Sequence, residues 1–161
     1  MNLKILGAAL LSLLIATADG AEEPRKVAFV DTGNTGRSVS AEAIANGLIA
    51  QRGWKVAVIS RAVDMDPFDV RPEPNAVKLL KDRGIDVGGH LATQMTAKHK
   101  AKVIELFPEV KDKTQTLAEY ATGTHADVPD AWGKPMEVYV AMIKQLDAYL
   151  PAALEKAATA R

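Results

Sequence analysis

The residues best suited to chemistry lie in one short stretch, residues 27–38, which reads VAFVDTGNTGRS. A β-branched apolar run leads into a turn with Gly33 and Gly36, and a helical pattern begins near Arg37 and Ser38. Glycines let successive backbone N–H groups converge, and a helix N-terminus adds partial positive charge. Arg37 adds a planar donor that can hold two phosphate oxygens. The stretch therefore predicts a cradle for phosphate or another oxyanion.

Residues 31–38 resemble the phosphate-binding loop of the low-molecular-weight protein tyrosine phosphatases and the related thiol-dependent arsenate reductases. The pattern of that loop is Cys-x-Gly-Asn-x-Cys-Arg-Ser after a short strand. Its Gly, Asn, Arg and Ser positions match, but Asp31 stands at the nucleophilic cysteine and Gly36 at the second one, and the chain contains no Cys. The thiolate chemistry of the family therefore cannot operate here. The resemblance implies that an oxyanion is held by Thr32, Gly33, Asn34, Thr35, Gly36, Arg37 and Ser38.

A second segment, residues 127–133, resembles the Asp-Pro-aromatic-Gly loop that contains the general acid of the family. Asp130 takes the place of that acid, and Ala131 replaces the Pro. The resemblance extends over most of the chain, with one further departure. The family usually has a polar helix and a central strand after the position of His90, and this chain is too short there. That strand is absent, shortened or supplied by residues 91–95.

Three interpretations of Asp31 remain open. In the first, its carboxylate pairs with Arg37 and fills the loop, so that an anion about 4 Å away is disfavoured by about 1 to 4 kcal/mol. In the second, Asp31 is a nucleophile that forms an aspartyl-phosphate, Asp130 is the general acid, and Mg²⁺ offsets the repulsion. In the third, the domain is a binding module that recognises an oxyanion, or a cationic ligand through Asp31, without turnover.

Other polar residues near the loop have simpler interpretations. Asn34 tolerates a left-handed backbone and is expected to organise the loop, and Ser38 is expected to be the N-cap of the following helix. The three histidines, His90, His99 and His125, lie at spacings that fit no zinc site. We therefore expect no metal and no other cofactor, except Mg²⁺ under the aspartyl-phosphate alternative.

These features favour a phosphatase-like protein that keeps its oxyanion-binding loop and has lost or impaired hydrolysis, that is, a pseudoenzyme of the phosphoric monoester hydrolases. The alternative is an active phosphomonoesterase with Asp31, Arg37 and Asp130 as catalytic residues. The expected partners are phosphate, another oxyanion, or a phosphorylated small molecule or peptide. Acidic and basic residues are equal in number, 20 each, and no basic block is found, which argues against a nucleic-acid partner.

Residues 1–18 have the pattern of a secretory signal peptide, with Lys4, an apolar run and the small-x-small sequence Ala16-Thr17-Ala18. The run is shorter than the roughly 20 residues of a membrane span, so no stable span is expected after cleavage. A short uncleaved anchor is the alternative. We expect a periplasmic or secreted protein. A cysteine nucleophile would be a liability in an oxidising compartment, which gives a physical reason for its absence.

The elements that must position the loop alternate between strands and helices. An N-terminal extension (19–25) precedes a single α/β domain (26–157), and a tail (158–161) follows. The domain is expected to be a short parallel sheet flanked by helices on both faces, with the loop at the carboxyl end of the first strand. Strands are predicted at 27–30 and 55–60, with a short edge strand at 115–120. Helices are predicted at 39–50, 73–83 and 96–107 and from 135 onward, where Pro151 kinks or ends the last one.

Overall fold

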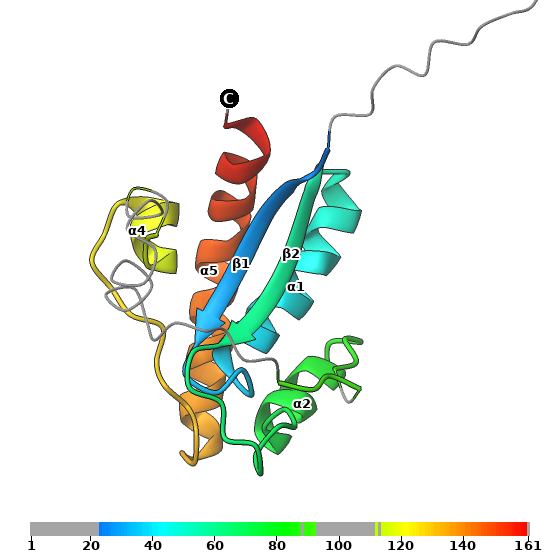
Figure 1. Ribbon diagram of the computed structural model, residues 1–161, viewed down its shortest axis with the longest axis vertical. Helices are drawn as coiled ribbons and strands as arrows, with labels where there is room; N and C mark the ends of the chain where they lie inside the picture. The colour runs from blue at the N-terminus through cyan, green and yellow to red at the C-terminus, as the bar shows by residue number, and fades with distance from the viewer. Residues whose placement is uncertain (1–22, 88, 93–111, 113, 161) are drawn as a thin grey trace, which may run out of the picture.

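The computed structural model describes residues 23–87, 89–92, 112 and 114–160. Figure 1 shows two strands side by side in front of α1 and α5, with α2 near the carboxyl ends of the strands and α4 beside α5. This arrangement confirms the expected α/β domain with a short parallel sheet flanked by helices. The elements in chain order are β1 (Arg25–Asp31), α1 (Arg37–Arg52), β2 (Val56–Ala62), α2 (Pro74–Lys81), α4 (Leu117–Thr122) and α5 (Met136–Thr159).

The two described strands are parallel, with Arg25 opposite Val56 and Asp31 opposite Ala62. Burial alternates along β2, as expected for a strand with one covered face. The last residue of β1, Asp31, is buried at the carboxyl end of the sheet. The strand register therefore brings Asp31 to the base of the loop that follows.

The helices α1 and α5 pack against each other and against the strands, and the core lies between them. As predicted, α1 begins directly after the loop and ends at Gly53, which has a φ of 65°. Burying a large apolar side chain contributes roughly 1.5 to 3 kcal/mol, so the apolar side of α5 is a main source of stability. Its fully buried side chains are Tyr139, Met142, Leu146, Leu150 and Leu154.

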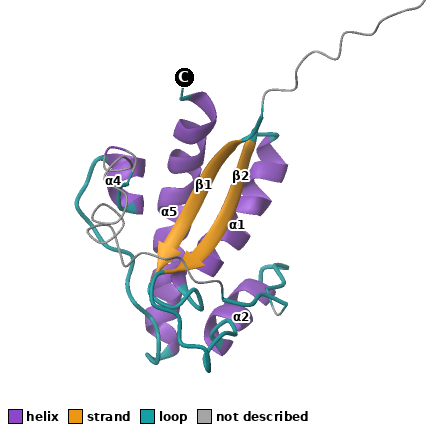
Figure 2. Cartoon of the chain, viewed as in Figure 1, coloured by secondary structure: helices purple, strands orange, loops and turns teal. Residues whose placement is uncertain are grey.

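The opposite face of the sheet is more open among the described residues. Val30 is 39% exposed and Ile59 is 44% exposed on that face, whereas α1 and α5 cover the other one (Figure 2). The helix predicted at 96–107 lies outside the described residues, as does most of segment 91–95. The arrangement of helices on both faces therefore stays a prediction.

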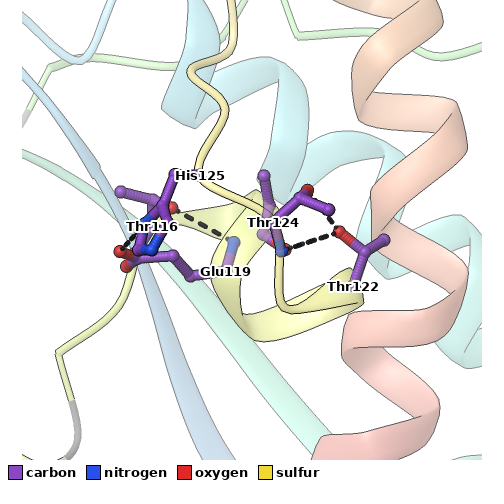
Figure 3. Close-up of polar contacts among 6 residues, drawn as sticks. Thr116, Glu119, Thr122, Thr124 and His125 are labelled. Carbon is purple, nitrogen blue, oxygen red and sulfur yellow. Dashed lines mark hydrogen bonds and ion pairs between the residues drawn. The ribbon is translucent and has the colours of Figure 1, made fainter.

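The edge strand predicted at 115–120 is wrong, because helix α4 begins at Leu117 and Thr116 is its N-cap (Figure 3). Thr116 Oγ1 accepts a hydrogen bond from the Glu119 backbone N–H at 3.2 Å, and Glu119 Oε2 accepts one from the Thr116 N–H at 2.8 Å. His125 Nδ1 also lies 3.0 Å from Glu119 Oε1. This reciprocal capping box satisfies two N–H groups that a short helix would leave unpaired, and it overrides the weak strand pattern.

The last helix, α5, does not end at Pro151 but continues to Thr159. Ala153, Leu154 and Ala157 follow the proline and are buried. Their apolar contacts offset the backbone hydrogen bond that proline cannot donate. The apolar pattern beyond Pro151 is therefore part of the core and not a frayed end.

Candidate oxyanion-binding site

The loop after β1 closes around the carboxylate of Asp31. Asp31 Oδ1 accepts a hydrogen bond from the backbone N–H of Asn34 at 2.6 Å, and Oδ2 accepts one from the N–H of Ser38 at 2.8 Å. The side chain is only 7% exposed, and Ser38 lies in the first turn of α1. The carboxylate therefore uses one backbone donor of the loop, Asn34, and one donor at the helix N-terminus, Ser38, where an anion is stabilised.

Asn34 organises the loop, as its residue type predicts. It is fully buried and has a φ of 58°, the only positive φ of a non-glycine residue among the described residues. Its Nδ2 donates to Ser38 Oγ at 2.8 Å, and its Oδ1 lies 3.1 Å from His90 Nε2. Because the amide oxygen can only accept, His90 donates from Nε2. The expectation that Ser38 is the N-cap is wrong, since Gly36 takes that position. Ser38 Oγ instead accepts the hydrogen bond from Asn34 Nδ2.

Three other backbone N–H groups of the loop remain available to a ligand. The N–H groups of Gly33, Thr35 and Gly36 donate to no atom of the part of the chain that the structure describes. All three residues line a cleft of about 260 Å³. These groups are the donors that an oxyanion in the cleft could still use.

The remainder of the cleft is strongly acidic. The segment between β2 and α2 forms one wall, and the loop before α5, including Asp130, Ala131 and Trp132, forms another. Arg37 is the one basic side chain among the lining residues. The acidic side chains of the lining are Asp31, Asp64, Asp66, Asp69 and Asp130. A dianion entering the cleft therefore meets more negative than positive charge.

Arg37 pairs with Asp130 across the mouth of the cleft, with Nη2 and Oδ2 3.2 Å apart. Their side chains are 25% and 62% exposed. No ion pair joins Arg37 to Asp31 among the described residues, in contrast to the first interpretation of Asp31. The structure nevertheless brings Asp31, Arg37 and Asp130 together around one cleft, as the sequence predicts.

The buried Tyr139 and the half-buried Glu73 link the loop to α5. The Tyr139 hydroxyl donates to Glu73 Oε2 at 2.9 Å, and the Glu73 backbone N–H donates to the carbonyl oxygen of Thr35 at 2.9 Å. Burial raises the pKa of Tyr139 well above its usual value, and the hydrogen bond to Glu73 and its negative charge raise it further. Tyr139 therefore remains a neutral donor that links α5 to the loop.

Sequence reasoning missed several residues of the site. Asp64, Asp66 and Asp69 form a wall of the cleft, and His90 contacts Asn34. The acidic segment directly follows β2, and the carboxyl ends of parallel strands meet at one edge of a sheet. That rule could have placed the three aspartates beside the loop. No local signal links His90 to Asn34, which is 56 residues away.

The described residues contain no group of three or more His, Cys, Asp or Glu side chains arranged to hold a metal ion. The described part of the chain also contains no helix that is long and apolar enough to cross a bilayer.

This chain belongs to the low molecular weight phosphotyrosine protein phosphatase family, whose model matches residues 26–160. It is 33% identical over 148 residues to a protein-arginine-phosphatase of Geobacillus stearothermophilus, covering 84% of this chain and 98% of the relative. A protein-arginine-phosphatase of Bacillus subtilis is 33% identical over 126 residues, 70% of this chain and 83% of the relative. The low molecular weight protein-tyrosine-phosphatase PtpB of Staphylococcus haemolyticus is 30% identical over 132 residues, 75% and 91% of the two chains.

Solved structures agree with this assignment. A Cys-to-Ser mutant of the YwlE arginine phosphatase with a phosphorylated active-site serine superposes with a TM-score of 0.77 at 29% identity, covering 84% of this chain and 97% of the other. A low molecular weight protein tyrosine phosphatase from T. tengcongensis superposes with a TM-score of 0.73 at 31% identity, covering 81% and 98%. The predicted family is therefore confirmed, together with the absence of its cysteines from this chain.

Proposed function

We propose that this protein is a phosphatase relative that binds phosphate, another oxyanion or a phosphorylated ligand, with lost or impaired hydrolysis. The observation that supports this proposal is the position of Asp31. Its carboxylate lies at the base of the loop, where the family pattern has the cysteine, and accepts hydrogen bonds from Asn34 and Ser38. Both carboxylate oxygens are thus already stabilised by donors, which lowers their tendency to attack phosphorus.

The proposed ligand is held by the groups that Asp31 leaves available. These are the backbone N–H groups of Gly33, Thr35 and Gly36 and the guanidinium of Arg37. The negative charge of Asp31 opposes an incoming anion by about 1 to 4 kcal/mol at a separation of about 4 Å. Binding is therefore expected to be weaker than in a loop with a neutral residue at that position.

The names of the relatives suggest which phosphorylated group is relevant. Two of the curated relatives are protein-arginine-phosphatases, and a third is a protein-tyrosine-phosphatase. Phosphoarginine and phosphotyrosine peptides are therefore the ligands to test after inorganic phosphate.

We also propose that the protein is exported, so that its site faces the periplasm or the exterior. The signal-like pattern of residues 1–18 supports this. Mass spectrometry of protein from fractionated cells is expected to show a chain that begins near residue 19 outside the cytoplasm. A full-length chain recovered from the cytoplasm would contradict export.

An active phosphomonoesterase is the second candidate, because Arg37 and Asp130 line the same cleft as Asp31. Arg37 Nη2 and Asp130 Oδ2 lie 3.2 Å apart there. In that reaction an Asp31 oxygen forms a bond to phosphorus while the ester P–O bond breaks, and Asp130, which must first be protonated and released from Arg37, gives its proton to the leaving oxygen. Water then hydrolyses the aspartyl-phosphate to release phosphate.

Two measurements on the purified protein separate these candidates. We expect inorganic phosphate to bind in a calorimetric titration, and Arg37→Ala to weaken binding by roughly ten-fold or more, because a charge-assisted contact is lost. Arg83→Ala is the matched control, since Arg83 pairs with Asp147 on another face. An absence of phosphate binding would contradict the proposal.

The second measurement is hydrolysis of p-nitrophenyl phosphate between pH 5 and pH 8, with and without Mg²⁺. We expect only background turnover. Turnover that Asp31→Asn abolishes would instead establish Asp31 as the nucleophile and favour the active phosphomonoesterase.

A further inference from the structure

Two large aromatic side chains are exposed at the cleft or next to it in the sequence. Trp132 lines the cleft, and Phe68 lies between the lining residues Asp66 and Asp69 in the sequence. Phe68 is 97% exposed and Trp132 is 62% exposed. Aromatic side chains of this size bury about 150–250 Å² each when they pack against a partner, and they are frequent anchors of protein interfaces. We call these two residues, together with Asp64, Asp66, Asp69 and Asp130, the rim of the cleft.

The Trp132 ring and the backbone at Phe68 are held in place before any partner arrives. Trp132 Nε1 donates to Asp69 Oδ2 at 3.0 Å, which joins the two walls of the cleft. The Phe68 N–H donates to Asp66 Oδ1 at 2.8 Å, and the Asp69 N–H donates to the Asp66 carbonyl at 3.1 Å. A preorganised surface loses little conformational entropy when it binds.

The charge of the rim determines which partner it can accept. The rim has four carboxylates, and the one lining arginine, Arg37, already pairs with Asp130. An acidic or phosphate-rich surface would be repelled, whereas Lys and Arg side chains would be attracted. The guanidinium of an arginine can also stack on the face of an indole ring.

We propose that the rim docks an extended basic segment of another protein. Its Lys or Arg side chains lie against the rim carboxylates, and its aliphatic stems pack on Phe68 and Trp132. This docking needs no oxyanion in the loop, so it does not depend on the proposed function. The rim would select a partner by the charge around the bound segment, whether or not that segment is phosphorylated.

The test is fluorescence anisotropy of labelled, unphosphorylated eight-residue peptides with the full chain. A peptide rich in Lys and Arg is expected to bind, and the same peptide with Glu at the basic positions is not. Affinity is expected to fall as salt is raised, because exposed charges are screened. Equal binding of the two peptides would overturn the proposal.

Matched variants locate the binding surface. Asp66→Asn with Asp69→Asn keeps both acceptor oxygens and removes two charges, and we expect binding to weaken roughly ten-fold. Phe68→Ala is expected to weaken it at least about five-fold, because an exposed anchor is lost. Glu155→Gln removes one exposed charge on α5 and is expected to change nothing. No effect of Phe68→Ala would overturn the proposal.

Two further titrations compare the basic peptide with a small cation and with an oxyanion. If free arginine amide binds as tightly as the peptide, the rim binds a small cation and not an extended segment of a protein. That result would overturn the proposal. Inorganic phosphate is titrated into the same sample. Peptide binding without phosphate binding would support the rim proposal and contradict the proposed function, and phosphate binding without peptide binding would do the opposite.

Discussion

We call Asp31, Asn34 and Ser38, which hydrogen-bond to one another in the loop after β1, the floor. These three residues are at most 7% exposed, whereas Phe68 and Trp132 of the rim are 97% and 62% exposed. The polar atoms of the floor bond mainly to one another and to backbone N–H groups. The rim instead presents carboxylates and aromatic rings to the surroundings. The difference indicates two roles. The polar groups of the floor are used in hydrogen bonds that maintain the loop conformation, whereas the side chains of the rim are exposed to a partner.

The largest expected effect comes from giving the floor a nucleophile. Asp31→Cys replaces the carboxylate by a sulfur nucleophile next to the loop donors and Arg37. We expect turnover of p-nitrophenyl phosphate to rise about 100-fold or more above the unaltered protein, because covalent attack and oxyanion stabilisation then act together. Asp31→Ser is the matched control. Background turnover by a folded Asp31→Cys variant would mean that the floor no longer has the geometry of an active loop.

The next effect concerns the rigidity of the floor. Asn34→Ala removes two side-chain hydrogen bonds, leaves Ser38 and His90 without these partners, and places alanine at a φ of 58°. We expect the free energy of unfolding to fall by about 2 to 4 kcal/mol in urea denaturation. Asn34→Gly relieves the backbone cost alone and should recover about 1 kcal/mol of it. If Asn34→Ala lowers the free energy of unfolding by less than about 0.5 kcal/mol, as surface substitutions typically do, the floor does not contribute to stability as a buried network would.

A smaller effect tests the support beneath the floor. The pKa of Tyr139 is raised in the folded protein by burial and by its hydrogen bond to Glu73. The unfolded chain therefore releases this proton first, near the usual tyrosine pKa of about 10. The stabilisation is complete below that pH and declines as pH rises above it. Tyr139→Phe should lower the free energy of unfolding by about 1 to 2 kcal/mol at pH 7. It should also make the free energy of unfolding, measured by urea denaturation, decline less steeply above about pH 10. Tyr149→Phe is the control.

The smallest expected effect on stability is at the rim. Asp130→Asn weakens an ion pair whose carboxylate is 62% exposed, so the free energy of unfolding should change by less than about 1 kcal/mol. Phosphate binding should tighten about three-fold in the same variant, because Arg37 is released from a competing charge. Asp147→Asn, which removes the partner of Arg83, is the control. If Asp130→Asn lowers the free energy of unfolding more than Asn34→Ala does, the rim contributes more to stability than the floor, contrary to this expectation.

Local sequence patterns predicted the backbone of the floor, although they gave the wrong role to Ser38. The β-branched run, the glycines of the loop and the helical pattern after Arg37 predict a strand, a turn and a helix in close succession, and β1 and α1 follow. Asn34 tolerates a left-handed backbone, and its φ of 58° agrees with that prediction. Local patterns were less reliable at residues 115–120. They predicted a strand there, but the capping box of Thr116 and Glu119 stabilises a helix.

The amino-acid sequence by itself determined the class of this protein, its α/β fold, the glycine-containing loop after the first strand and the exchange of the family cysteine for Asp31, because these depend on residues adjacent in the chain. The tertiary structure decided the rest. Trp132 meets Asp69 across 63 residues, and His90 meets Asn34 across 56. Such contacts arise only when folding brings the loop before α5 and the segment after α2 to the carboxyl edge of the sheet, which no short sequence window encodes. The acidic, aromatic character of the rim is therefore a property of the folded chain.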